Sequence, residues 1–155
     1  MEPPKVYFLK NEMKLKKKIL DKKILPGKAL VMVDGEKIYS SEHLIIAFHH
    51  ACRRWSKGAT KSSSLSMETI LFASLTLQID VAVRRIGLHE NSRFAALLVY
   101  DTTCDLSGYT IIEPPEITLN ESFLNNLGLD TQAGMEKDQI RNTIIERMAL
   151  LNLLQ

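Results

Sequence analysis

The stretch from Thr60 to Tyr100 limits the fold more than any other part of the chain. It opens with a basic, serine-rich loop that we expect to end at Ser66, because a serine hydroxyl accepts hydrogen bonds from the free N–H groups that begin a helix. Apolar residues then recur at helical spacing, and a break near residues 75–77 separates them from a second helical pattern that ends at Gly87. There we expect a left-handed cap, a conformation that glycine adopts without strain. The apolar run FAALLVY follows and predicts a buried central strand.

Several elements precede this stretch. Apolar residues within 6–9 predict a first strand, and residues 11–24 show an approximate helical stripe crowded with lysines. Residues 29–33 predict a second strand, followed by a turn. A serine at position 40 or 41 then caps a helix that runs to Gly58.

The part of the chain beyond Tyr100 completes the predicted fold. Residues 109–112 are a candidate strand, and residues 121–127 predict a short helix closed by Gly128. The last helix starts near Glu136 and carries four apolar residues on one face, namely Ile140, Ile144, Met148 and Leu151. Together these elements predict an α+β fold, a small and mostly antiparallel sheet flanked by helices, in a single domain that covers residues 1–155.

Length and composition favour a soluble, cytoplasmic protein without a membrane partner. The 155 residues, 45% of them apolar, suffice for one domain with a real core. No apolar run approaches the roughly 18 residues that a membrane span needs, and the N-terminus lacks the apolar segment of a signal peptide. Charge is uneven, since residues 1–100 hold 17 Lys/Arg against 9 Asp/Glu and residues 101–155 hold 3 against 9. This asymmetry is compatible with a basic face for a polyanion, and equally with a surface on which the two signs mix.

The sequence shows no catalytic constellation and predicts no cofactor or metal. Its seven glycines form neither a dinucleotide-binding nor a P-loop motif. His49 and Cys52 have a spacing that suits one metal, but no second pair of ligands completes the set. The serine run from Ser62 lacks a recognisable base or oxyanion hole. We therefore expect a protein that is not an enzyme.

The most concentrated basic site outside the lysine-rich segment lies around the end of the helix that stops at Gly58. Arginines and lysines there precede the serine loop and the start of the next helix. Serine hydroxyls, free N–H groups and cations are the groups that hold phosphate. The predicted phosphate contacts are Arg54, Lys57, Lys61, Ser64 and Ser66. The alternative is that these serines only cap a helix.

Two helices carry more apolar residues than one face can bury. On the last helix, Leu150 and Leu154 lie partly outside the core stripe, and residues 70–72 are three consecutive large apolar side chains. An uncovered apolar patch is a liability unless a partner covers it. The predicted partner interface comprises Leu71, Leu75, Met148, Leu150 and Leu154. Homodimerisation through the same patch is the alternative.

The segment KSSSLSMETILFASLTLQIDVAVRRIGL resembles a known family. It matches, in order, the K-S/T-L-S-x-E-I/L-L … Q/N-I-x-x-A-x-x-x-x-G-I pattern of the small kinase-binding subunit of the KEOPS tRNA-modification complex, a family that includes the animal PRPK-binding protein. The segments ALVMVDGEKIYSSEHLIIAFHHA and IIERMALLNLL resemble that family's strand-turn-helix unit and its C-terminal helix. The resemblance runs from about Ala29 to the end of the chain.

The resemblance implies a non-catalytic subunit of the complex that makes threonylcarbamoyl-adenosine in tRNA. Its direct partner would be the N-terminal lobe of the complex's small atypical kinase, which acts there as an ATPase. The threonylcarbamoyl transferase and the dimerisation subunits would be indirect partners, and archaeal members also help to hold tRNA through its 3′ CCA end. On this view the predicted phosphate contacts meet tRNA and the predicted interface meets the kinase. One departure is Leu77, where many archaeal members carry an arginine.

Two other classes of function stay open at this stage. One is a small-molecule enzyme of α+β fold with an unrecognised site. The other is a generic RNA-binding module that uses the lysine-rich segment, against which stands the lack of aromatic residues near the basic ones for stacking on bases.

Overall fold

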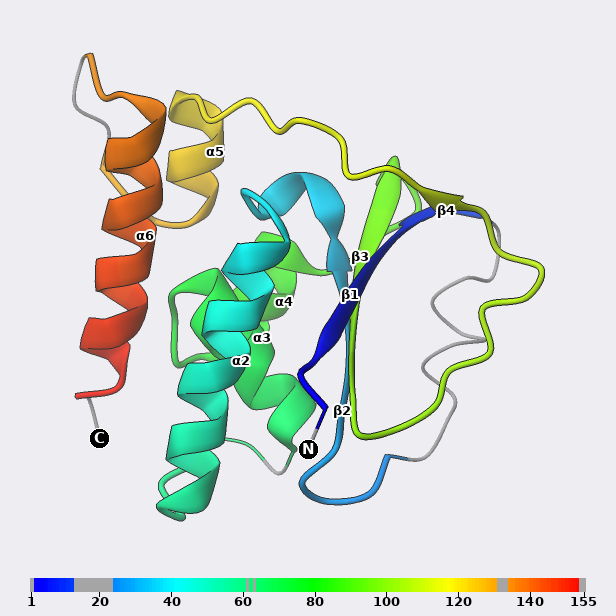
Figure 1. Cartoon of the computed structure of the whole chain (residues 1–155). Helices are drawn as coiled ribbons and strands as arrows, with labels where there is room; N and C mark the ends of the chain where they lie inside the picture. The colour runs from blue at the N-terminus through cyan, green and yellow to red at the C-terminus, as the bar shows by residue number, and fades with distance from the viewer. Residues whose placement is uncertain (1, 13–23, 61, 63, 131–133, 154–155) are drawn as a thin grey trace.

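The computed structural model describes residues 2–12, 24–60, 62, 64–130 and 134–153. The predicted lysine-rich helix falls largely on residues outside this set. In chain order the elements are β1 (Lys5–Lys10), β2 (Ala29–Asp34), the 3₁₀ turn η1 (Gly35–Lys37), α2 (Ser41–Ser56), α3 (Leu65–Ser74), α4 (Ile79–Ile86), β3 (Phe94–Tyr100), β4 (Ile111–Ile112), α5 (Glu121–Asn126) and α6 (Lys137–Leu151). The predicted α+β fold is confirmed: helices pack on one face of a four-stranded antiparallel sheet (Figure 1).

The strand order is β2-β3-β1-β4, so the FAALLVY run is central as predicted. It pairs with β1 from Lys5↔Val99 to Lys10↔Phe94, and with all of β2 on its other side. Both faces of β3 are covered, since Ala96 and Leu98 belong to the main core and Ala95 and Leu97 to a second cluster. Because both faces of β3 are buried, its sequence is a continuous apolar run and does not alternate between apolar and polar residues.

β4 begins two residues later than predicted, at Ile111, and ends at Ile112 as predicted. It pairs Phe8↔Ile112 and Leu9↔Ile111. Continued by two residues, this register would set Pro114 opposite Val6, and proline has no N–H to donate to a ladder. The strand therefore ends, and the chain runs on in extended form to α5 (Figure 1).

α3 is apolar all round because the protein surrounds it. It packs against α2, α4, α6 and β2, and Leu71, Phe72 and Ala73 are all fully buried. A helix that is hydrophobic on every side belongs in a core. The sequence predicted that the large side chains at 70–72 are surplus and mark a partner surface, but Leu71 and Phe72 are buried in the core.

The break between α3 and α4 lies where predicted. The left-handed residue, which was predicted at Gly87, lies at this break instead. Leu75 adopts φ 60° and ends α3, whereas Gly87 has φ −63° and leads from α4 into extended backbone. The prediction of a left-handed cap at Gly87 was wrong. Glycine is needed there for space, because a Cβ would collide with the carbonyl oxygen of Val83.

The last helix begins at Lys137 behind a capping box formed by Glu136 and Gln139. Its buried face is the predicted one, made of Ile140, Ile144, Met148 and Leu151. Among the described residues, no single helix is long and apolar enough to cross a membrane. In the described part of the chain, one pair of helices, α3 and α4 with a bend of 68° between them, has sufficient length and composition when taken together.

Candidate functional site

The end of α2 presents a row of cationic or titratable side chains to solvent. His49, Arg53 and Lys57 follow one another at intervals of four residues, so they lie on one side of the helix. All three are exposed, and we call them the α2 ridge. The only acidic residue of α2 is Glu42, in its first turn. The ridge therefore has no negative charge of its own helix beside it.

Arg54, predicted as a phosphate contact, is buried instead, with 3% of its surface exposed. Its Nη2 donates a 2.5 Å hydrogen bond to the main-chain oxygen of Leu151, and its guanidinium lies 4.8 Å from the centre of the Phe72 ring. A cation at a helix carboxyl end satisfies a free carbonyl and opposes the helix dipole. Arg54 thus fastens α6 to α2 and is not presented to a ligand.

A second contact joins the same two helices. The side-chain amide of Asn152 lies within hydrogen-bond distance of His50 Nδ1, and the His50 ring stacks on Phe72 at 5.4 Å. Burial, then the neighbouring charge of Arg53, lowers the pKa of His50. The imidazole is therefore neutral near pH 7 and can accept a hydrogen bond from the Asn152 amide. The C-terminal turn of α6 is held at two points.

The serine loop is built differently from the prediction. Ser64, not Ser66, caps α3 by accepting a 3.0 Å hydrogen bond from the Met67 N–H. Ser66 lies inside the first turn, where its hydroxyl accepts a hydrogen bond from the Leu30 N–H of edge strand β2. The hydroxyl oxygen of Ser66 thus satisfies a backbone N–H group at the edge of the sheet. Lys61, the central cation of the predicted phosphate site, lies outside the described residues.

Glu68 was missed by the sequence reasoning. Its side chain is fully buried and accepts a 2.5 Å hydrogen bond from the Ser62 hydroxyl. A carboxyl group therefore already uses one hydroxyl of the serine loop, although Ser62 was not among the predicted phosphate contacts. The sequence signals at this position are the S-x-x-x-x-x-E spacing ahead of an apolar run and the glutamate of the S-L-S-x-E motif.

The predicted partner interface divides into core and surface. Leu71, Leu75 and Met148 are buried, so they stabilise the domain and are not available on its surface. Leu150 is 55% exposed, and Leu154 lies outside the described residues. Leu153, which the prediction did not include, is 75% exposed. We call Leu150 and Leu153 the leucine patch.

No hydrolytic centre or metal site can be assembled in the described parts of the chain. No group of three His, Cys, Asp or Glu side chains is placed to hold a metal there. Ser92 donates a 3.0 Å hydrogen bond to Asp34, and His89 Nε2 lies 3.6 Å from the same carboxyl oxygen. In a nucleophilic triad the histidine must stand between the serine and the acid. Here the acid stands between them, and its other oxygen caps η1 by accepting from the Glu36 N–H.

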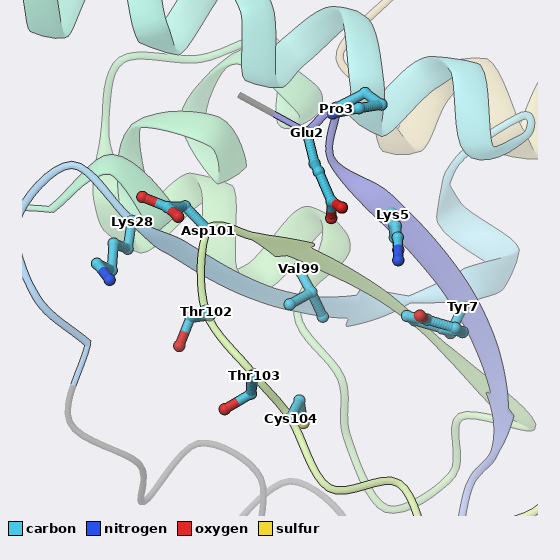
Figure 2. A pocket seen from close by; sticks show the side chains of 10 residues that line it. All are labelled: Glu2, Pro3, Lys5, Tyr7, Lys28, Val99, Asp101, Thr102, Thr103 and Cys104. Atoms are coloured by element: carbon cyan, nitrogen blue, oxygen red, sulfur yellow. The ribbon is translucent and has the colours of Figure 1, made fainter.

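A hollow of about 660 Å³ lies at one end of the sheet, on the face away from the helices (Figure 2). It is lined by Glu2, Pro3, Lys5, Tyr7, Lys28, Val99, Asp101, Thr102, Thr103 and Cys104. Two lysines and two carboxyl groups leave the lining without net charge, and it contains no histidine. It offers neither the positive field of a phosphate site nor a nucleophile with a histidine base.

Comparisons with known proteins place these features in context. A family model described as kinase binding protein CGI-121 matches residues 7–152, nearly the whole chain. A comparison with curated proteins gave no match.

Proposed function

Because the chain belongs to the family of kinase binding protein CGI-121, we propose that it is a non-catalytic accessory subunit that binds a protein kinase. The observation that carries this proposal is the match of the family model across residues 7–152. The non-catalytic part of the proposal agrees with the geometry, since Ser92, Asp34 and His89 lie in the wrong order for a nucleophilic triad. The isolated protein should neither hydrolyse ATP nor bind a stoichiometric metal, and ATPase activity or zinc that copurifies with it would contradict this.

We further propose that the kinase is the small atypical kinase of the KEOPS complex. The protein would then serve threonylcarbamoyl-adenosine formation in tRNA, with the transferase and dimerisation subunits as indirect partners. The central motif from Lys61 to Leu88 supports this assignment. The test is affinity capture of the tagged full chain from its own cells, followed by mass spectrometry. Recovery of a small kinase together with the transferase is expected, and the absence of both would count against the assignment.

We propose a narrower role in tRNA recruitment than the sequence indicated. Lys57 is exposed at the end of α2 and supports contact with the phosphates of the tRNA 3′ end. Ser64 and Ser66 already accept main-chain hydrogen bonds, and Arg54 is buried. Each lost phosphate contact lowers the slope of log affinity against log salt by about 0.7–0.9. Lys57→Ala should reduce tRNA affinity and this slope, while Ser66→Ala should leave both unchanged.

A further inference from the structure

The hollow of about 660 Å³ on the sheet face away from the helices is built from strand ends (Figure 2). Lys5 stands opposite Val99 in the β1–β3 register. The β2–β3 register, continued by one residue, sets Lys28 opposite Asp101. Residues 2–3 and the loop after β3 supply the walls. A concavity of this volume falls within the range of small-molecule sites, about 300–1,000 Å³.

Side chains on this face become more polar towards the hollow. Along β1, Leu9 is fully buried in the second apolar cluster, Tyr7 is half-buried and Lys5 is exposed. β3 shows the same gradient from Leu97, which is fully buried, to the exposed Asp101. Alternate residues of a strand lie on one face, so these residues belong to the same surface. Tyr7 packs against the apolar cluster and also lines the hollow, so the cluster forms its inner wall.

Both signs of charge meet in the hollow without pairing. Its four charged side chains are Glu2, Asp101, Lys5 and Lys28. No ion pair or side-chain hydrogen bond between described residues includes any of the four. Elsewhere on the surface a neighbouring acid and base do pair, as Arg93 does with Glu36 at 3.1 Å. The four charged groups of the hollow are therefore available to a ligand.

The charges are divided between two sides of the hollow, with one cation and one carboxylate on each. Figure 2 shows Glu2 and Lys5 on the side of β1, with Lys28 and Asp101 across from them. Lys28 is half-buried, and Asp101 adopts a left-handed backbone with φ 52°, which non-glycine residues seldom do. Residues held in such conformations cluster at ligand sites. The side with Lys28 and Asp101 is therefore the better ordered one.

A ligand that carries both signs matches this arrangement. A metal ion would place a positive charge before the two lysines, and a phosphate group would place a negative charge before the two carboxylates. A molecule with an ammonium and a carboxylate group makes charge-assisted hydrogen bonds with both kinds of side chain. An α-amino acid has these two groups on one carbon atom. Hydroxyl groups remain for its side chain, and they belong to Tyr7, Thr102 and Thr103.

We propose that this hollow binds a small zwitterion of the α-amino-acid class with a polar side chain. Lys28 receives the carboxylate of the ligand, and Asp101 receives its ammonium group. The site goes beyond the proposed kinase-binding function and does not depend on it, because it lies on the face of the sheet away from the helices.

The test is an NMR titration of the ¹⁵N-labelled full chain with each of the proteinogenic L-amino acids in turn. At least one polar amino acid should give saturable shifts at Lys28, Asp101 and residues 102–104, with a dissociation constant of about 1 mM or tighter. The carboxamide of the best ligand lacks the carboxylate, and its N-acetyl derivative lacks the ammonium group. Each should bind about tenfold more weakly or worse, the effect expected when a charge-assisted hydrogen bond is lost.

Two variants test the assigned contacts. Lys28→Met keeps the apolar stem, and Asp101→Asn keeps a residue type that tolerates the left-handed backbone. Each should weaken binding of the best amino acid about tenfold. Lys10→Met on β1 and Asp80→Asn on α4 remove the same charges at exposed positions outside the hollow, and both should bind as the wild type does.

The dispersion of the same spectra shows whether each variant is folded. The absence of saturable shifts with every amino acid would overturn the proposal, and the four charges would then form only a solvated rim. Equal binding of the carboxamide, or full affinity in folded Lys28→Met and Asp101→Asn proteins, would overturn it as well. Since the titration uses the isolated chain, a failure to bind the kinase would leave this result unchanged.

Discussion

The Arg54 guanidinium donates a hydrogen bond to the main-chain oxygen of Leu151, 97 residues further along the chain. This bond joins the end of α2 to the end of α6, and Phe72 of α3 lies against the same guanidinium. Three helices therefore meet at one buried cation. The C-terminal turn of α6 depends on this contact for its position, and so do the exposed Leu150 in that turn and Leu153 just after it.

Replacing Arg54 should destabilise the domain far more than replacing its neighbour. Arg54→Met keeps much of the side-chain length but removes a hydrogen bond from a charged donor, which typically contributes about 1.5–3 kcal/mol. We expect a loss of about 2–3 kcal/mol in the free energy of unfolding, measured by urea denaturation. Arg53→Met, at an exposed position, should change it by no more than about 0.5 kcal/mol. Equal effects of the two variants would contradict the buried role of Arg54.

Ser66→Ala should lower stability without affecting RNA binding. The variant leaves the Leu30 N–H without its hydroxyl acceptor, and an unsatisfied buried donor costs about 1–3 kcal/mol. Ser56→Ala, on the exposed side of α2, is the matched control and should be nearly neutral. A stable Ser66→Ala protein with weakened tRNA binding would restore the phosphate role that the sequence suggested.

Stability should fall in mild acid because of His43. This residue is fully buried, accepts a hydrogen bond from the Tyr39 N–H at Nδ1, and lies 2.8 Å from the Ala73 oxygen through Nε2. Burial lowers its pKa to about 4, from 6.5 in the unfolded chain. The unfolded state therefore binds more protons between these values. The contribution of His43 is complete above about pH 6.5 and is lost towards pH 4, with a slope of up to about 1.4 kcal/mol per pH unit.

The variant that isolates this effect is His43→Gln, which cannot be protonated. It should be less stable than the wild type near pH 7, and its stability should depend less on pH between about 6.5 and 4. Urea denaturation at several pH values provides the comparison. Parallel pH profiles for the two proteins would show that His43 does not titrate as its burial requires.

Gly87 and Gly58 should respond differently to asparagine, which tolerates a left-handed backbone. Gly58 has φ +67° with open space around it, so Gly58→Asn should change stability little. Gly87→Asn introduces a Cβ that meets the Val83 carbonyl, and overpacking of this kind costs about 1–3 kcal/mol. Thermal or urea unfolding of both variants distinguishes them. Similar tolerance at both positions would contradict the steric role of Gly87.

Much of the fold could be predicted because local patterns encode it. The cap of α2 at Ser40, the central strand and the buried face of α6 follow from residue type and period alone. The family resemblance likewise rests on short motifs in a fixed order. Elements of this kind depend little on what packs against them.

The candidate site could be predicted only in part, because burial is set by distant segments. Arg54 and Lys57 are equivalent in a count of charges, yet α6 covers one and leaves the other exposed. Leu71 seemed surplus because α3 was taken to have a solvent face, which its four neighbouring elements remove. Glu68 is a polar residue at a buried position, which a pattern of apolar residues does not reveal.

The most direct test of the account is a calorimetric titration of the full chain with the purified small kinase of the same organism. We predict a saturable complex of one to one stoichiometry with a dissociation constant in the micromolar range or tighter, roughly −8 kcal/mol or more favourable in free energy. Folded protein that gives no binding signal at concentrations of about 100 µM or above would contradict the kinase-binding role itself.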